Sequence, residues 1–335
     1  MTSLRVTIAD VAREAGVSQQ TVSRAINNKA EISPQTRTHV LAVVERLGYR
    51  PSGLARGLVT QKTHTIGLVV PDIANPFFSE MARGAEDAAH LAGYSLLLGD
   101  TIEDPEREAR VLATLEEKRV DGIVLCSSRL PEDELVALSR RHSNLVLVNR
   151  RLPDHQVGIV IVDDTAGARQ AVQHLIRLGR RTIGFLAGPQ GSHSAQLRTE
   201  GYRAGLTEAG LTFDPTLLVP CLPNRDGGFE AANKLLGDRP DADALFCYND
   251  LVAVGALQAC AEMGRKVPDT VAVIGCDDIL LAGLVTPPLT TLHSDQRTLG
   301  ARAMQMVLDK IGGCADGCDE FVLRPGLVVR ASAPE

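Results

Sequence analysis

The chain has 335 residues, enough for a small domain followed by a larger body of two lobes. It holds 35 Lys and Arg residues against 41 Asp and Glu, which gives a formal net charge of −6. The N-terminus does not resemble a signal peptide and no apolar run reaches about 18 residues, so we exclude a membrane protein and expect a cytoplasmic one.

Residues 7–27 predict two short helices joined by a tight turn. Thr7 with Asp10 forms a capping box, Gly16 suits the left-handed end of a helix, and Ser18 caps the second helix. The positions that follow the helical period and should face a core are Ile8, Val11, Ala12, Ala15, Val17, Val22, Ala25 and Ile26.

The outer face of the second helix is unusually polar. It holds Gln19, Gln20, Ser23, Arg24 and Asn27. Amides, hydroxyls and an arginine pack a core poorly but hydrogen bond well to base edges in a DNA major groove. The periodicity by itself also fits an ordinary helical hairpin.

A third helix should complete a small domain over residues 1–50. It begins with Ser33 as cap and Pro34 at the first helical position, and Gly48 ends it. Its expected inward residues are Val40, Leu41, Val44 and Leu47. Residues 1–62 hold nine basic and four acidic residues, so this segment carries +5 and the rest −11. A basic end on an acidic body is typical of a protein that neutralises phosphates at one end.

The run from Val6 to Asn27, followed by Leu47–Pro51 and Leu54–Leu58, resembles the LacI/GalR family of bacterial transcription regulators. The resemblance implies a repressor whose homodimer binds a pseudo-palindromic DNA operator. It implies base reading by Gln19, Gln20 and Arg24, and contacts to the DNA backbone by Thr7, Ser18, Ser23 and Asn27.

Residues 51–62 correspond to the hinge helix and linker of that family. Ser52, Gly53 and Gly57 depart from the usual pattern, and each interior glycine weakens a helix by roughly 0.5–1 kcal/mol. We therefore expect residues 51–59 to become helical only on the operator. The resemblance implies minor-groove contacts by Leu54, Ala55 and Leu58, with Leu58 as the wedge that kinks the DNA.

From Thr65 onward the chain alternates apolar runs with helical segments in two series, which predicts an α/β body of two lobes with parallel sheets. We expect a second series to begin with the strand Gly158–Val162 and a single last strand near Phe321–Val329. The body resembles periplasmic binding proteins and spans 63–335. Lobe 1 is expected at about 63–160 and 294–321, and lobe 2 at about 161–292 and 322–331.

Ligands of such sheets bind at the carboxyl ends of the strands. Polar groups at these ends, together with the family pattern, indicate an effector site at Asn75, Phe77, Phe78, Arg150, Asp164, Arg198, Asn249 and Asp277. Phe77 and Phe78 are equally well explained as core residues. For Asp163, Asp250 and Asp278 we favour helix N-capping over ligand contact.

A guanidinium and several carboxylates around a cleft suit hydrogen bonds to vicinal hydroxyls, so we expect a carbohydrate effector. Residues 222–226 lack the bulky group that the family often places over the ligand. This departure favours a pentose, hexose or sugar acid over a purine.

Three other classes fit less well. A periplasmic sugar-binding protein would lack the basic N-terminal domain. A dinucleotide-dependent enzyme would need a Gly-x-Gly-x-x-Gly turn after a strand, and a serine hydrolase a Gly-x-Ser-x-Gly motif, and neither is present. Seven cysteines in mostly apolar runs indicate reduced thiols. Cys314 and Cys318 have no second pair or histidine near them in sequence, so we expect no metal site there. Because the enzyme motifs are missing, we also expect no cofactor and no enzymatic activity.

Overall fold

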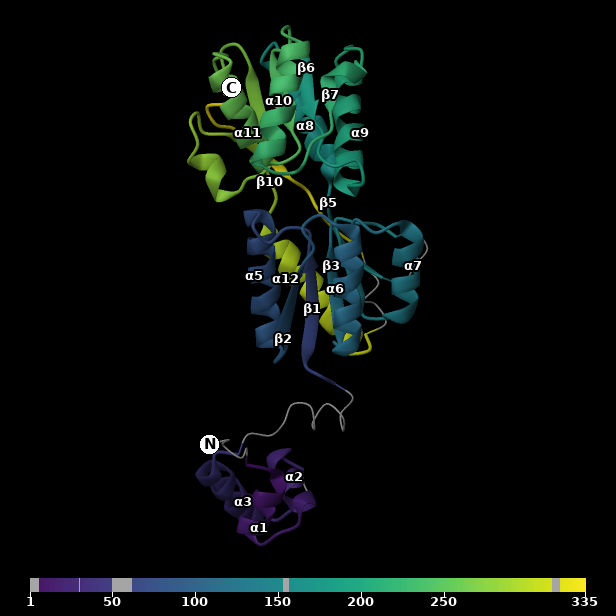
Figure 1. Cartoon of the computed structure of the whole chain (residues 1–335), viewed down its shortest axis with the longest axis vertical. Helices are drawn as coiled ribbons and strands as arrows, with labels where there is room; N and C mark the ends of the chain where they lie inside the picture. Colours follow the sequence, from purple (N-terminus) through teal and green to yellow (C-terminus); the bar gives the residue numbers. More distant parts are fainter. Residues whose placement is uncertain (1–5, 30, 50–61, 153–156, 315–319) are drawn as a thin grey trace. The chain divides into compact units, whose positions relative to one another are not determined.

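A computed structural model describes residues 6–29, 31–49, 62–152, 157–314 and 320–335 (Figure 1). The chain separates into two compact units, Met1–Thr63 and His64–Glu335. The predicted hinge contacts Leu54, Ala55 and Leu58 lie outside the described residues, so their role stays a prediction. None of the described helices is both long and apolar enough to cross a bilayer.

The first unit contains three helices, α1 (Ile8–Ala15), α2 (Gln19–Ile26) and α3 (Pro34–Leu47). The predicted capping box between Thr7 and Asp10 is confirmed, and Gly16 ends α1 with φ at 64°. Ser18 Oγ accepts a hydrogen bond from the amide of Thr21 at 3.1 Å. These local signals fix the turn between α1 and α2 and the direction in which α2 leaves it.

The core of this unit is made of small apolar side chains, namely Val11, Ala12, Ala15, Val22, Ala25, Val40 and Val43. The prediction that Leu41 faces inward is wrong, because its side chain is 43% exposed. Val40, Val43, Val44 and Leu47 follow the helical spacing and form one stripe, whereas Leu41 lies about 100° away from Val40 around the axis.

The second unit contains two six-stranded sheets. The sheet of lobe 1 has the order β11 (Glu320–Leu323), β5 (Gly158–Val162), β4 (Leu145–Val148), β3 (Gly122–Cys126), β1 (Thr65–Val70) and β2 (Ser95–Asp100). The sheet of lobe 2 has the order β12 (Gly326–Val328), β10 (Thr290–His293), β9 (Ala272–Asp277), β8 (Ala244–Cys247), β6 (Ile183–Leu186) and β7 (Leu218–Val219). The described pairings are parallel except for β10 with β12, as the α/β alternation predicted.

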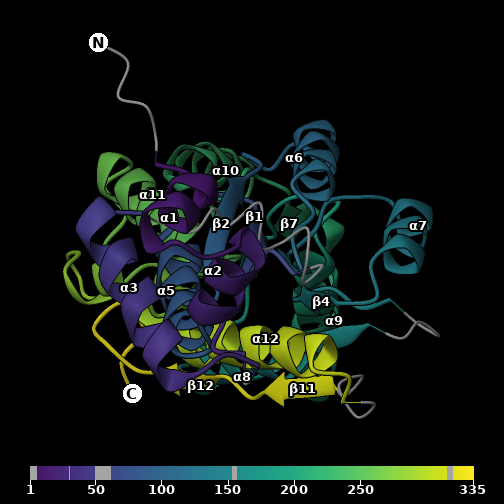
Figure 2. The same cartoon turned by 90° about the horizontal axis from the view of Figure 1, so that it is seen from below.

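Helices cover both faces of each sheet (Figures 1 and 2). Those of lobe 1 are α5 (Pro76–Leu91), α6 (Pro105–Glu117), α7 (Glu132–Arg141) and α12 (Gln296–Ile311). Those of lobe 2 are α8 (Asp164–Arg177), α9 (His193–Glu208), α10 (Arg225–Asp238) and α11 (Asp250–Glu262), with short 3₁₀ turns at Pro215–Leu217 and Leu280–Gly283. Apolar clusters therefore line both faces of each sheet.

Two predictions about the lobes are wrong. Strand β5 does not begin the second series, because it pairs in parallel with β4 and belongs to lobe 1. The single last strand is two strands, since β11 pairs with β5 and β12 pairs with β10 in the other sheet. Pro325 lies between them, where it cannot donate a ladder hydrogen bond. Only the nine residues 149–157 separate β4 from β5, too few for a crossover helix, so the alternation of strands and helices could not assign β5 to a sheet.

Helices α5 and α12 approach each other closely at glycines (Figure 2). A Cβ atom at Gly300 would lie 1.9 Å from the carbonyl oxygen of Met81.

We expect Gly300→Ala to lower the free energy of unfolding by about 1–3 kcal/mol, because the backbone must move to admit the methyl group. Gly237→Ala is the matched control, since nothing lies within 4 Å of its Cβ position in α10. That variant should be neutral or more stable by about 0.5–1 kcal/mol. Equal denaturation midpoints for the two variants would contradict this account.

Candidate DNA-reading helix and interlobe pocket

Helix α2 presents the predicted DNA-reading side chains. Gln19, Gln20 and Asn27 are exposed, whereas Ser23 and Arg24 are half-buried. Neither glutamine amide has a hydrogen-bond partner in the described part of the chain, so both are available to an external partner. Arg24 is engaged instead, because its Nε lies 3.0 Å from an oxygen of Glu31. An exposed pair of this kind contributes no more than about 1 kcal/mol and is readily exchanged for another acceptor.

The residues predicted to contact the DNA backbone already have intramolecular roles. Thr7 Oγ1 donates to Asp10 at 2.7 Å, and Ser18 Oγ caps α2. Ser23 Oγ accepts a hydrogen bond from Nδ2 of Asn27 at 3.3 Å. These groups therefore fix the helix ends, and any phosphate contact would be made in addition to that role.

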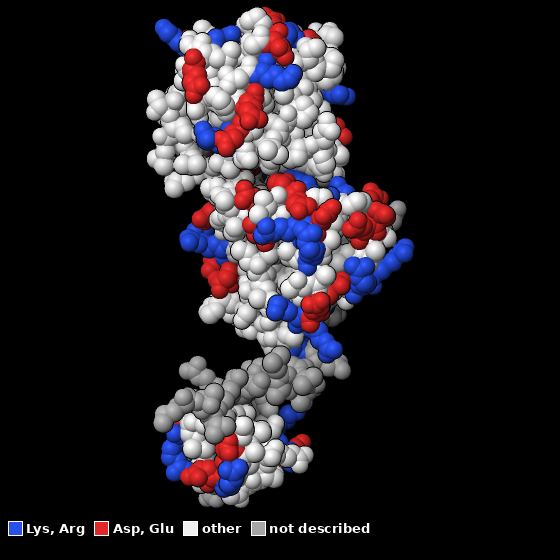
Figure 3. Space-filling model, viewed as in Figure 1, with Lys and Arg blue, Asp and Glu red and all other residues white. Residues whose placement is uncertain are grey.

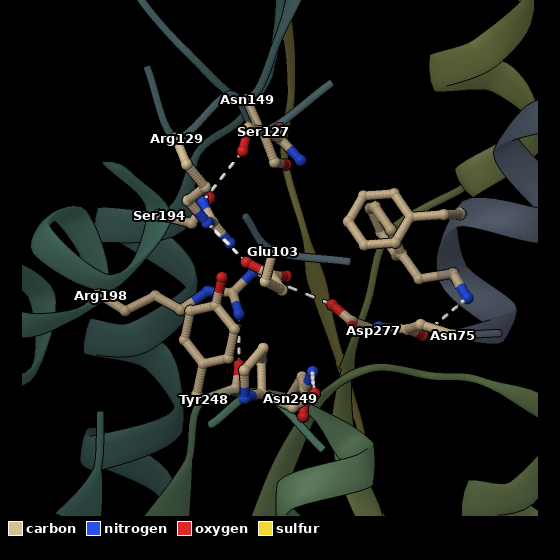
Figure 4. Close-up of a pocket in the computed structure, with 13 residues that line it drawn as sticks. Asn75, Glu103, Ser127, Arg129, Asn149, Ser194, Arg198, Tyr248, Asn249 and Asp277 are labelled. Atoms are coloured by element: carbon tan, nitrogen blue, oxygen red, sulfur yellow. Dashed lines mark hydrogen bonds and ion pairs between the residues drawn. The ribbon is translucent and has the colours of Figure 1, made fainter. Parts of the chain in front are cut away.

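A pocket lies between the two lobes of the second unit (Figure 4). Lobe 1 contributes Asn75, Phe77, Phe78, Glu103, Ser127, Arg129 and Asn149. Lobe 2 contributes Ser194, Arg198, Pro223, Tyr248, Asn249 and Asp277. Most of these residues stand at or just beyond the carboxyl ends of strands, where parallel sheets place their ligands.

Six of the eight residues predicted for this site line the pocket: Asn75, Phe77, Phe78, Arg198, Asn249 and Asp277. Two do not. Asp164 lies behind Arg198 and pairs with it, and Arg150 is replaced at the pocket wall by its neighbour Asn149. Residue 149 has a φ of 52°, which turns the chain directly after β4. Its Oδ1 accepts a hydrogen bond from the amide of Val162 at 3.1 Å.

Arg198 is the most constrained side chain of the pocket. It is buried, and its Nε donates to Asp164 at 2.8 Å while Nη1 donates to the carbonyl of Tyr248. Its Nη2 lies 3.9 Å from Asp277, and its guanidinium carbon lies 4.8 Å from the centre of the Tyr248 ring. These partners raise the pKa of Arg198 despite its burial, so the guanidinium is held in one orientation with its charge kept.

A second arginine, Arg129, was missed from the sequence. Its Nε donates to Glu103 at 2.6 Å and its Nη1 to the carbonyl of Ser127 at 3.0 Å. A usable signal existed, because Ser127 and Arg129 directly follow β3, at the edge where the other site residues were sought. The structure thus adds a cation–carboxylate pair from lobe 1 that faces the pair from lobe 2.

Asp277 combines burial with an unusual backbone. Its φ is 113°, a conformation that residues other than glycine rarely adopt, and Gln296 Nε2 donates to its carbonyl from lobe 1. Burial raises the pKa of Asp277 from 3.8 to about 7, with Arg198 acting against the shift and Asp164 adding to it. The carboxyl group can therefore change its charge near neutral pH.

The interpretation of the three other aspartates as helix caps holds for one of them. Asp163 caps α8, accepting from the amide of Ala166 at 3.0 Å. Asp250 does not cap α11, because it is buried and accepts from the Ile279 amide at 2.8 Å and from Thr291 Oγ1 at 2.5 Å. Asp278 bonds to Arg330 at 2.6 Å and to His293 at 3.0 Å.

The caps at this edge are asparagines. Asn75 caps α5 through Oδ1, and Asn249 caps α11 through Oδ1 while its Nδ2 donates to the Pro223 carbonyl at 3.0 Å. Both the oxygen and the nitrogen of the Asn249 amide are therefore already engaged in hydrogen bonds within lobe 2.

The two interpretations of Phe77 and Phe78 both hold, since the rings belong to the apolar core of lobe 1 and also line the pocket. They meet edge to face at 5.1 Å. In the segment 222–226, Leu222 is 62% exposed and Pro223 reaches the pocket wall. The free space is about 30 Å³, room for one or two water molecules. A ligand the size of a sugar therefore requires the walls to move apart.

Within the described residues no group of three or more His, Cys, Asp or Glu side chains is placed to hold a metal ion. The six described cysteines are free thiols, and burial raises the pKa of Cys221 and Cys260 to about 11. Cys318, the partner considered for Cys314, lies outside the described residues.

Comparison with known proteins gives matches over nearly the whole chain. Residues 7–52 match the model "Bacterial regulatory proteins, lacI family", and residues 63–322 match "Periplasmic binding proteins and sugar binding domain of LacI family". The HTH-type transcriptional regulator DegA of Bacillus subtilis is 36% identical over 332 residues, 98% of each chain.

Two solved structures extend the likeness to the fold. The lac repressor dimer bound to operator and the anti-inducer ONPF matches with a TM-score of 0.88 and 28% identity, covering 99% of this chain and 100% of that one. The transcriptional regulator CelR in complex with cellobiose matches with a TM-score of 0.75 and 34% identity, covering 98% and 100%.

Proposed function

This chain belongs to the lacI family of bacterial regulatory proteins, and from that premise we propose that it represses transcription as a homodimer on a pseudo-palindromic operator. The chain is a DNA-binding regulator whose larger unit responds to a small effector. We propose that the effector is a carbohydrate, that it binds in the interlobe pocket, and that the protein works in the cytoplasm. The domain limits 1–50, 51–62 and 63–335 belong to the same proposal.

The polar face of α2 supports the proposed base reading. Gln19 and Gln20 offer amides with free donors and acceptors, the groups that pair with adenine in the major groove. Arg24 would exchange Glu31 for a guanine edge. Thr7 and Ser18 are N-caps, where hydroxyls and backbone N–H groups suit phosphates. Ser23 and Asn27 offer polar side chains that can bond to the DNA backbone from the outer face of α2.

The charge balance of the pocket supports a polyhydroxyl ligand. Its two guanidinium groups, Arg129 and Arg198, are each paired with a carboxylate, and Asp277 lies beside the second pair. Little excess positive charge is left for an anion. Paired arginines and carboxylates instead offer donors and acceptors side by side, which vicinal hydroxyls can satisfy. The cellobiose complex of CelR and the sugar-binding description of the family model point to the same class.

Exposed apolar side chains support the homodimer. Leu91, Leu98 and Ile102 in lobe 1 are 88%, 47% and 60% exposed, and Leu280 and Leu284 in lobe 2 are 79% and 69% exposed. On the face shown in Figure 3 the second unit also has broad areas without charged side chains. Exposed leucines and isoleucines of this kind become buried when a partner covers the surface on which they lie.

Binding rather than conversion is the chemistry we propose for the pocket. Its described lining contains no His, Cys or Lys. DegA, which is 36% identical to this chain, is a transcriptional regulator. Turnover of a bound sugar would contradict this part of the proposal.

The observation that carries the proposal is a polar reading helix combined with a charge-balanced interlobe pocket. A screen of neutral sugars, sugar acids and nucleobases by the thermal unfolding of the full chain tests it, because a ligand that binds the folded state raises the midpoint. We expect one or more sugars to raise the midpoint and to change binding to the selected operator. Stabilisation by nucleobases alone would overturn the carbohydrate assignment.

Gln20→Ala tests base reading directly. We expect it to cost about 1–3 kcal/mol on the selected operator and to relax preference at one base pair in each half-site, because one bidentate contact is lost. Gln35→Ala, at an exposed position of α3, is the control and should bind as wild type. Binding to a panel of operators with single base changes is the measurement. A uniform loss across the panel would show that Gln20 contacts the backbone instead.

A further inference from the structure

One carboxylate lies directly beside the DNA-reading helix of the first unit. Glu31 stands in the turn between α2 and α3, and its Oε2 lies 3.0 Å from Nε of Arg24 on α2. The side chain of Arg24 is 39% exposed and that of Glu31 is 63% exposed, so an incoming ligand can reach both partners. A carboxylate at this place calls for a physical reason, because DNA is a polyanion that repels it.

The other ion pairs in the described part of the first unit do not involve α2. One lies within α1, and one joins α1 to α3. Those pairs can support the packing of the three helices. The pair of Arg24 with Glu31 instead engages a side chain that is predicted to read bases, and it does so while Gln19 and Gln20 on the same helix are exposed.

Glu31 offers Arg24 an acceptor that competes with DNA. A carboxylate and a phosphate bind a guanidinium through the same charge-assisted hydrogen bonds, so Glu31 supplies what a DNA phosphate would supply. Non-specific binding depends on basic side chains that neutralise phosphates, and a guanidinium already neutralised by Glu31 adds little to it. Guanine differs, because its O6 and N7 accept two hydrogen bonds from arginine in a fixed geometry. Glu31 therefore competes better with phosphates than with a correctly placed guanine.

We propose that Glu31 is a specificity determinant that keeps Arg24 paired on random DNA and releases it to guanine on the operator. Repulsion between Glu31 and phosphates lowers the affinity for all DNA. The affinity for random DNA is lowered more, because Arg24 is also withheld there. The inference rests on the proposed function, since base reading by Arg24 is its premise, and it adds the residue that limits non-specific binding.

Glu31→Gln tests the proposal, because it keeps the length of the side chain and removes its charge. The full chain is titrated onto a labelled duplex of random sequence, and onto an operator selected from a random pool with wild type, at several KCl concentrations. On the random duplex we expect about tenfold tighter binding and a log–log salt slope steeper by about one, because one more cation then meets a phosphate. On the operator we expect a gain of about threefold or less, since Arg24 already contacts guanine there.

A double-mutant cycle shows whether Glu31 acts through Arg24. Arg24→Ala has no guanidinium to withhold, so adding Glu31→Gln to it should change binding to the random duplex by less than about twofold. Glu45→Gln is the matched control for net charge, because Glu45 is exposed in the last turn of α3. It should bind both duplexes within about twofold of wild type, since salt screens a charge that pairs with no reading residue.

Three results would overturn the proposal. They are an unchanged affinity of Glu31→Gln for the random duplex, equal gains on the random duplex and the operator, and a gain in the Arg24→Ala background as large as in wild type. The last result would show that Glu31 acts only as a negative charge near phosphates. The proposed function fails separately, because wild type would then bind no selected duplex more tightly than the random one.

Discussion

Replacing Arg198 with alanine is expected to abolish effector binding and to destabilise the second unit. The guanidinium bonds Asp164 at 2.8 Å and the Tyr248 carbonyl, and it lies 3.9 Å from Asp277. Asp164 is only 3% exposed, so its carboxylate would be left buried without its partner. Breaking a buried pair in this way costs about 3–5 kcal/mol. Calorimetric unfolding and effector titration measure the two losses.

A double variant separates the two effects. Arg198→Met with Asp164→Leu removes both charges, and replacing a whole buried pair by apolar groups is often neutral or stabilising. We expect it to regain much of the lost stability while effector binding stays absent. Arg203→Ala, on the exposed side of the same helix, is the control for α9 and should keep effector binding. Recovery of effector binding in the double variant would show that Arg198 acts only through the fold.

The fold was largely predictable because its signals are local. The capping box at Thr7, the glycine stop at Gly16 and the buried runs of the central strands each act over a few residues. The assignment of β5 to a sheet, and the division of the last strand, depend on pairing between distant segments. A period of apolar residues carries no information about which sheet a strand joins.

The candidate site was predicted in part for the same reason. Most of the predicted residues follow strand ends, which parallel sheets bring together, whereas Arg198 was assigned from the family pattern. Six of the eight predicted residues line the pocket. Arg129 and Glu103 were missed because their pairing joins two loops that are 26 residues apart. Asn149, which was not predicted, lines the pocket after a left-handed turn, whereas its predicted neighbour Arg150 is not among the lining residues.

The stability of the second unit is expected to fall as pH rises through neutrality, and Asp277 should account for part of the fall. The pKa of Asp277 is raised from 3.8 to about 7, so the folded state holds a proton that the unfolded state has already released. For an acid with a raised folded pKa, the stabilisation is full below about pH 4. It declines between pH 4 and 7 and is lost above the folded pKa. The difference corresponds to about 4 kcal/mol over that range.

Asp277→Asn isolates this contribution. The asparagine amide has the shape of the carboxyl group and can form hydrogen bonds, but it does not ionise. The variant should therefore lose less stability than wild type between pH 5 and pH 8. Burial also raises the pKa of Asp250, and the charge of Asp277 adds to that shift, so the difference between the two proteins includes the effect of Asp277 on Asp250. Asp278→Asn is the control, because this neighbour is bonded to Arg330 and His293 outside the pocket.

The same titration should reach the effector. A hydroxyl that donates to the Asp277 carboxylate favours its charged form, so effector binding below pH 7 must release the proton. We therefore expect the affinity of wild type to rise by up to about tenfold per pH unit from pH 5 towards pH 7 and then level off. Asp277→Asn should bind more weakly and without this slope. If the affinity of that variant depended on pH with the same slope as wild type, another group would be titrating and Asp277 would not contact the ligand.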